Sequence, residues 1–237
     1  YTEADERYAA KRRSQKSSVR TRQLPGVSPL GFSRFLLEKT AFLSLSDMGK
    51  ALPSYEEIPI ACRMDEAVQS EYKRIENALV RVLRSDRRVA QKILSAYLNL
   101  LTVYPDQPYD QKRIFYPDSD EPIVEPENIG DTDTLGEKEQ KTSEIVRAAI
   151  QNRERALIYT SWVRTDSQQK LKKLLTDEGY RTEILTDKIK TTDREDWVQK
   201  KLAAGMQVLI VNPSLVETGL DLNAFTTLVF YSMGYKL

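Results

Sequence analysis

The second half of the sequence alternates between helical and strand-like segments, and this alternation constrains the fold more than any other feature. Segments with helical apolar spacing are each followed by a short apolar run, in the order 139–151 then 156–160, 166–178 then 181–185, and 192–203 then 207–211. A last apolar run covers residues 226–231. Helices that alternate with buried strands through short connections form a parallel sheet with helices on both faces. Gly179 and Gly205 lie where glycines end helices. The sequence therefore predicts an α/β fold.

A polar loop separates the last two apolar runs, residues 208–211 and 226–231. Runs without a polar face are typical of central strands in a parallel sheet. In open α/β sheets, ligand-binding residues lie in the loops beyond the carboxyl ends of the strands. An ordinary turn with a glycine remains the alternative. Four residues of the loop are candidates for ligand contact: Glu217, Thr218, Gly219 and Asp221.

The first half of the sequence is expected to form three further parts. Residues 1–30 are basic and poor in apolar side chains, which favours a flexible, solvated arm over an arm that binds the DNA backbone. Residues 31–104 are expected to form a bridging segment and then a helical hairpin, because two amphipathic stripes meet near Asp86. Residues 105–138 contain five prolines and many acidic side chains, which predicts an irregular, acidic and partly mobile linker.

Smaller expectations concern the segments that flank the first amphipathic helix. Residues 32–45 are apolar enough to pack as a helix, and residues 56–62 could form an edge strand, since Pro59 argues against a central position. Asp65 is expected to cap the long helix that follows. Cys62 is expected to be a small buried apolar residue rather than a reactive thiol.

The composition excludes several kinds of site. The chain of 237 residues has no histidine and a single cysteine, so a zinc site, an internal disulfide and a histidine base are excluded, and no metal site is predicted. The formal net charge of +1 argues neither for nor against a nucleic-acid partner. No GxxxxGK[ST] motif is present to hold a triphosphate and its Mg²⁺, and no GxGxxG fingerprint is present either. The chain alone is not expected to hydrolyse a nucleotide.

The location of the protein is inferred from what the sequence lacks. No apolar run approaches the roughly 18 residues that a membrane span needs. The cysteine usage favours a reducing compartment, and we expect a cytoplasmic protein, or a nuclear one in a eukaryote. Residues 1–5 have neither a signal-peptide profile nor an initiator methionine, so the chain is expected to be a piece of a longer polypeptide.

Several motifs resemble those of superfamily-2 helicases and translocases. The apolar run 208–211, its polar turn and Gly219-Leu220-Asp221 are similar to the fifth conserved motif of that superfamily, and residues 156–161 resemble the fourth. Residues 35–39, 52–57 and 69–72 are similar to the bridge into the second ATPase lobe of the Swi/Snf-type branch. The resemblance covers roughly residues 30–237 and implies a second, C-terminal RecA-like lobe over residues 139–237, preceded by a helical insertion and the acidic linker.

The resemblance implies a lobe of an ATP-dependent DNA helicase or translocase that is inactive by itself. In this family the P-loop lies on a first lobe, and the arginine finger belongs to a sixth motif that would begin near Tyr235, so no catalytic residue is expected in this chain. ATP and Mg²⁺ would be bound mainly by the first lobe of the same parent chain. Glu217, Thr218, Gly219 and Asp221 would form one wall of the ATP cleft and couple it to the nucleic acid.

The resemblance also implies a second set of residues that contact the backbone of duplex DNA. Thr160 and Ser161 end a strand with two hydroxyl groups, and Arg164 and Lys188 lie in loops nearby. For the two hydroxyls a helix cap is the alternative, and for Lys188 a solvated side chain. The family threonine at the end of the fifth-motif strand is Pro213 here, which has no amide to donate.

Two other functions are alternatives to a motor lobe. A non-catalytic α/β scaffold or protein-binding module would use the helical hairpin and the acidic linker for contacts with other proteins. A Rossmann-like transferase is disfavoured, because the glycine-rich turn that holds its nucleotide is absent.

Overall fold

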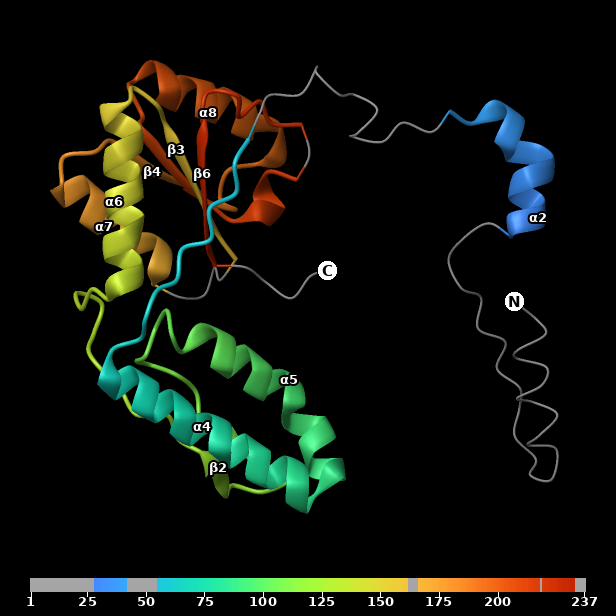
Figure 1. Cartoon of the computed structure of the whole chain (residues 1–237), viewed down its shortest axis with the longest axis vertical. Coiled ribbons are helices and arrows are strands. Elements are labelled where there is room, and N and C mark those ends of the chain that lie inside the picture. The colour runs from blue at the N-terminus through green and yellow to red at the C-terminus, as the bar shows by residue number, and fades with distance from the viewer. Residues whose placement is uncertain (1–27, 42–54, 162–165, 218, 233–237) are drawn as a thin grey trace. The chain divides into compact units, whose positions relative to one another are not determined.

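The computed structural model describes residues 28–41, 55–161, 166–217 and 219–232 (Figure 1). The chain divides into two units, Tyr1–Pro59 and Ile60–Leu237. In the first unit, α2 (Pro29–Gly31), a π-helical turn η1 (Phe32–Leu36) and a 3-10 turn η2 (Leu37–Lys39) follow each other. Residues 32–39 are therefore helical, but Phe35, Leu36 and Leu37 are exposed rather than packed as predicted. Residues 42–45 lie outside the described part.

The second unit contains a four-stranded parallel sheet. Its strands are β3 (Ala156–Thr160), β4 (Thr182–Leu185), β5 (Val208–Val211) and β6 (Thr227–Ser232), and their order in the sheet is β4-β5-β3-β6. Each pair of neighbours is parallel. Every residue of β5 is buried, as expected for a strand that is covered on both faces. The predicted α/β fold with a parallel sheet is confirmed.

Helices cover both faces of this sheet (Figure 1). On one face, α6 (Glu137–Gln151) and α7 (Ser167–Asp177) bury Val146, Leu171 and Leu175 against the alternate strand residues that include Ile158 and Ile210. On the other face, α8 (Arg194–Ala203), which follows the short 3-10 turn η4 (Thr191–Asp193), buries Val198 against Leu157 and Leu209. Neighbouring residues of a strand point to opposite faces, and this produces two separate apolar layers.

Two glycines end helices as predicted. Gly179 follows α7 with φ 91°, and Gly205 follows α8 with φ 89°. Glycine adopts this left-handed backbone without the steric penalty that a side chain brings, so each helix ends and the chain turns directly into the next strand. The short returns set the positions of β4 and β5 in the sheet.

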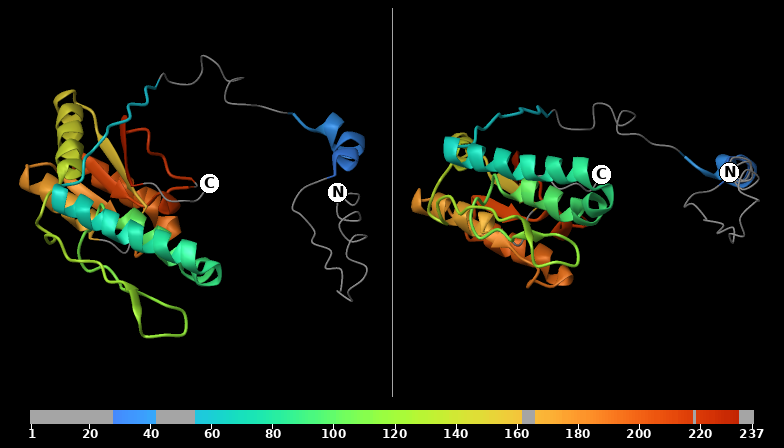
Figure 2. Two further views of the ribbon diagram at one scale, coloured as in Figure 1. Left: turned by 60° about the horizontal axis from the view of Figure 1, so that its bottom comes forward. Right: turned by 90° about the horizontal axis from the view of Figure 1, so that it is seen from below.

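The helical hairpin is formed by α4 (Glu66–Ser85) and α5 (Arg87–Val103), which lie side by side (Figures 1 and 2). Ile75 and Tyr97, one from each helix, are fully buried in the hairpin core. Asp86 lies between the helices and caps α5, because its Oδ1 accepts hydrogen bonds from the Arg88 and Val89 amides at 2.8 and 3.1 Å. The break at Asp86 explains why one long amphipathic pattern folds as two helices.

The segment predicted as an irregular linker contains a small antiparallel sheet, β1 (Ile114–Phe115) paired with β2 (Pro122–Val124). Ile114 and Val124 are buried in the core of the hairpin. The segment is also tied to α4, since the buried Glu71 accepts a 2.8 Å hydrogen bond from the Glu127 amide and a bidentate pair of 2.6 Å bonds from Arg74. Outside these two short strands residues 105–136 are irregular, as predicted, but the segment also packs on the hairpin, because the apolar residues among its prolines cover that core.

The segment before α4 also differs from the predictions. Residues 55–65 have no regular structure, so the edge strand predicted over 56–62 is absent. Cys62 is exposed rather than buried. Asp65 occupies the position before α4 but its side chain accepts no capping hydrogen bond. In the part of the chain that the structure describes, no helix is both long enough and apolar enough to cross a membrane.

Candidate functional site

The carboxyl edge of the sheet is held together by three polar residues from three strand ends. Ser161 follows β3, Asn212 follows β5, and Ser232 ends β6. The Ser161 amide donates to Ser232 Oγ at 2.8 Å, and Ser161 Oγ donates to the Ser232 carbonyl at 2.8 Å. Asn212 Nδ2 donates to the Ser161 carbonyl at 3.0 Å. This network fixes the loops that leave the sheet at the edge where α/β proteins bind ligands.

Thr160 and Ser161 have different environments although they are neighbours. Thr160 has no exposed surface, and its hydroxyl accepts a 2.7 Å hydrogen bond from Gln168 Nε2 in the first turn of α7. Ser161 is half-buried and joins the strand ends. Among the described residues neither hydroxyl caps a helix, since the N-cap position of α7 is Asp166. Arg164 lies outside the described residues.

Lys188 lies at the same edge, in the loop between β4 and η4, and is exposed. The neighbouring loop begins at Asn212, whose Oδ1 accepts from the Ser214 amide at 2.9 Å and so caps the 3-10 turn η5 (Pro213–Leu215). Two loops from neighbouring strands, β4 and β5, thus start side by side, one with a cation and one with a rigid polar turn.

The loop with the motif residues is anchored to the start of α8. The Asp221 amide donates to Glu195 Oε2 at 2.9 Å, and Asp221 Oδ1 accepts from the Asn223 amide at 3.0 Å. Gly219 has φ 79°, and the space around it is open. Glu217, Gly219 and Asp221 are exposed, while Thr218 lies outside the described residues. The anchored loop presents the predicted carboxylates to solvent at a defined position.

Apolar residues of the same loop pack against the lobe and fix the position of the loop. Leu220 and Leu222 alternate with the exposed residues and pack against the cluster beneath α8. Arg194 adds two bonds to carbonyl oxygens, from Nη1 to Leu215 at 3.0 Å and from Nε to Ile189 at 3.2 Å. These roles of Arg194 and Glu195 could not be predicted from the sequence, since charged residues in the first turn of a helix are common on any surface.

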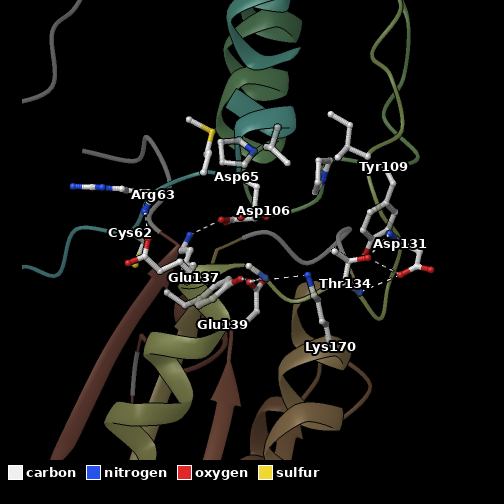
Figure 3. Close-up of a pocket in the computed structure, with 18 of the residues that line it drawn as sticks. Cys62, Arg63, Asp65, Asp106, Tyr109, Asp131, Thr134, Glu137, Glu139 and Lys170 are labelled. Carbon is white, nitrogen blue, oxygen red and sulfur yellow. Dashed lines mark hydrogen bonds and ion pairs between the residues drawn. The ribbon is translucent and has the colours of Figure 1, made fainter. Parts of the chain in front are cut away.

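A pocket of about 410 Å³ opens near this edge, between the base of the hairpin, the linker and the first turns of α6 and α7 (Figure 3). Glu139 from α6, Lys170 from α7 and Tyr231 from β6 meet in its wall. Glu139 Oε1 accepts from the Tyr231 hydroxyl at 2.7 Å and lies 3.2 Å from Lys170 Nζ. All three side chains are buried. The pocket wall therefore contains a buried, compensated charge pair.

The contacts in this cluster shift the pKa of Glu139 and of Tyr231. Burial by itself opposes the charge of Glu139, but the charge of Lys170 and the hydrogen bond from Tyr231 outweigh it and lower the pKa of Glu139. Burial, followed by the nearby carboxylate of Glu139, raises the pKa of Tyr231. At neutral pH the cluster is an ionised pair that accepts a phenol hydrogen bond.

A second buried carboxylate joins the hairpin to the lobe at the same pocket. Asp106, just beyond α5, pairs with Lys138 Nζ of α6 at 2.5 Å, and Lys138 Nζ lies 4.3 Å from the centroid of the Tyr231 ring. Burial raises the pKa of Asp106. Next to it, Gln107 Oε1 accepts from the Asp166 amide at 3.0 Å. The hairpin is thus fastened to the first turns of both helices on this face.

The pocket was not predicted from the sequence. Its one visible signal was Glu139, a charged residue seven positions before the buried Val146 and so on the same face of the helix. Within the described ranges, no group of three or more His, Cys, Asp or Glu side chains is arranged to hold a metal ion.

Comparison with known proteins shows what the carboxyl-terminal part of the chain resembles. Residues 137–237 match the family model of the helicase conserved C-terminal domain. The fold is similar to two solved structures from Sulfolobus solfataricus. One is the SWI2/SNF2 ATPase core in complex with dsDNA, with 16% identity and a TM-score of 0.54 over 72% of this chain and 33% of that chain. The other is the SWI2/SNF2 ATPase C-terminal domain, with 15% identity and a TM-score of 0.53 over 72% of this chain and 68% of that chain. No curated protein matches the sequence.

Residues 137–237 are therefore similar to a helicase C-terminal domain, and their parallel sheet has the RecA-like fold. The fold is also similar to that of the SWI2/SNF2 ATPase C-terminal domain, as the motifs predicted. The chain spans about one third of the length of the DNA-bound ATPase core that it matches.

Proposed function

We propose that the chain is the C-terminal lobe of an ATP-dependent DNA helicase or translocase and works with a first ATPase lobe in the same parent polypeptide. The observation that carries this proposal is the loop from Glu217 to Leu222, which is anchored at the carboxyl edge of a domain that matches the helicase family. The chain has no P-loop, so by itself it does not turn over ATP.

The motif loop would form one wall of the ATP cleft. Its residues fit a supporting role, because exposed carboxylates repel a triphosphate but accept hydrogen bonds from ribose hydroxyls or pair with an opposing cation. Asp221 is suited to that contact, Gly219 permits close approach of the backbone, and Thr218 offers a hydroxyl. ATP with Mg²⁺, held mainly by the first lobe, would supply the phosphoryl transfer that drives movement.

The neighbouring residues would contact the phosphate backbone of duplex DNA. Ser161 and Lys188 offer a hydroxyl and a cation at one edge, and contacts of this kind do not read sequence. Arg164, three residues after Ser161 in the sequence, would add a second cation. Thr160, whose hydroxyl is buried against Gln168, would position Ser161 rather than touch DNA. One of the similar structures is a complex with dsDNA, which supports this partner. A protein of this kind would work in the cytoplasm, or in the nucleus of a eukaryote.

A non-catalytic scaffold or protein-binding module is the second candidate. The observation in its favour is a pair of exposed apolar side chains on α5, Leu94 and Leu98, one helical turn apart on the hairpin. Apolar surface of this kind suits a protein contact. This function would leave the carboxyl edge of the sheet without a role in ATP turnover.

The two candidates are separated by ATP hydrolysis in the polypeptide that contains both lobes, measured with and without duplex DNA. We expect Thr218→Ala combined with Asp221→Ala to reduce DNA-stimulated turnover by roughly 10- to 100-fold, because the coupling loop loses the groups that position the nucleotide. Turnover in the double variant equal to wild type would contradict the motor function.

The matched control exchanges the same two residue types at the opposite edge of the sheet. Thr176→Ala combined with Asp177→Ala lies at the end of α7, where both side chains are exposed, and should leave turnover unchanged. The 237-residue chain alone is the second control and should be silent. If the complete polypeptide is silent as well, the scaffold function replaces the motor function.

A further inference from the structure

The free end of the hairpin carries four arginines within eight residues. They are Arg81 and Arg84 at the end of α4 and Arg87 and Arg88 at the start of α5. All four are exposed. In the described part of the chain none of them forms a salt bridge, whereas Arg74 and Lys92 on the same two helices are paired with Glu71 and Asp118.

The one acidic residue in this stretch does not neutralise them. Asp86 directs Oδ1 to the amides of Arg88 and Val89 and so serves as the cap of α5. From residue 81 to residue 88 the sequence has four positive charges against this single negative charge. The turn is therefore a concentrated positive surface, on a chain whose formal net charge is +1.

Two of the arginines lie where the helix itself disfavours them. Arg87 and Arg88 are the first two residues of α5, at the end of a helix that carries partial positive charge. Arg84, in contrast, lies in the last turn of α4, where a cation is favourable. Helix stability accounts for Arg84 but opposes Arg87 and Arg88, and an anion bound at the turn would relieve that repulsion.

The dimensions of the turn fit a polyanion better than a single small anion. Residues 81 to 84 span about 4.5 Å along α4, and two packed helices are about 8–10 Å apart, so the arginine backbones are spread over roughly 10 Å. Duplex DNA carries one negative charge per about 1.7 Å of its axis, so a span of that size faces about six phosphate charges.

We propose that the α4–α5 turn is a second nucleic-acid contact that binds the phosphate backbone of duplex DNA, in addition to the carboxyl edge of the sheet. This inference rests on the proposed function in that DNA is taken as the partner. The opposite end of the hairpin contacts Lys138 of α6 and Asp166 at the start of α7. The two packed helices therefore connect DNA bound at the turn to the lobe.

The test measures binding of the 237-residue chain to two duplex DNAs of unrelated sequence over a series of salt concentrations. Arg87→Gln with Arg88→Gln is expected to lower the affinity for both duplexes by roughly tenfold or more at low salt. The slope of log K against log salt should fall by about 1.8, since each lost phosphate contact removes about 0.9. Arg81→Gln with Arg84→Gln reports the same surface from the other helix.

The matched control is Arg153→Gln with Lys200→Gln, which removes two charges from exposed positions away from the turn. Arg87→Lys with Arg88→Lys keeps the charge and should keep most of the binding. If the glutamine variants weaken binding no more than the control does while the wild-type chain binds DNA, the inference is overturned and the proposed function stands. A wild-type chain that binds neither duplex at low salt overturns both.

Discussion

The two ends of the helical hairpin handle charge in opposite ways. At the base, Asp106 and Lys138 are paired, and Glu139 and Lys170 are paired beside them and buried. At the turn between α4 and α5, four arginines are exposed and have no ion-pair partner among the described residues. Both regions are rich in charged residues. A buried charge that is paired within the chain holds two segments together, whereas an exposed charge without an ion-pair partner is available to bind another molecule.

The energetic consequence follows from how the surroundings screen charge. A buried ion is costly once its partner is removed, because no water replaces the lost interaction. An exposed ion is solvated and contributes little to folding. Changes at the base should therefore act on stability, and changes at the turn should act on binding.

The largest expected effect is the loss of the buried cation at the base. Lys170→Met keeps most of the side-chain volume but leaves the carboxylate of Glu139 buried without its cation, and we expect the free energy of unfolding to fall by about 3 kcal/mol. Chemical denaturation at neutral pH measures this change.

Lys173→Met is the matched control on the same helix. Lys173 pairs with Asp133 at 2.5 Å, but both side chains are more than 60% exposed, so this variant should stay close to wild type. Equal losses in the two variants would show that burial does not distinguish the pairs.

The two carboxylates at the base should contribute to stability with opposite dependences on acid pH. The pKa of Glu139 is lowered from its ordinary 4.5, so its stabilisation is present above that value and is lost as the pH falls through the lower, folded value. The pKa of Asp106 is raised from 3.8, so its contribution runs the other way and falls as the pH rises through the folded value. Protonation of Asp106 thus offsets part of the loss at Glu139.

We therefore expect Asp106→Asn to lose more stability than wild type between pH 7 and about pH 3, because the offsetting group is gone. Denaturation curves at several pH values give the slope for each protein. A shallower loss in Asp106→Asn than in wild type would reverse the sign assigned to Asp106.

The smallest expected effect is a difference in stability between variants of two arginines in the turn, Arg84 and Arg88. Arg84→Gln removes a cation from the last turn of α4 and should reduce the free energy of unfolding by on the order of 0.5 kcal/mol, whereas Arg88→Gln at the start of α5 should be neutral or slightly stabilising. Thermal unfolding at low salt compares the two. A larger loss for Arg88→Gln would mean that Arg88 serves the fold and not a partner.

The elements of the lobe could be predicted from the sequence because each depends on local patterns. Strand β3 has the bounds that apolar spacing indicated, α4 and α5 meet at Asp86 as predicted, and the glycines after α7 and α8 end those helices. The motif loop was also predicted, since its apolar and polar residues alternate between two strands. The contact of each candidate residue with a ligand stays a prediction, and Thr218 and Arg164 in addition lie outside the described residues.

The errors arose where burial depends on distant segments. Cys62 is exposed because the chain before α4 does not pair as a strand, and the proline-rich segment is ordered because it covers the hairpin. The local sequence does not indicate which apolar surface, formed by distant residues, such a segment will cover.

By itself, the sequence determined the order of helices and strands from α6 to β6, the parallel sheet and the position of the motif loop, because the periodicity of apolar residues is a property of neighbouring positions. Only the tertiary structure decided which charges are paired. Glu139 meets Tyr231 from 92 positions away, and Asp106 meets Lys138 across a junction between two parts of the chain. The cost of burying a charge depends on the partner that folding brings to it, and no local pattern contains that partner.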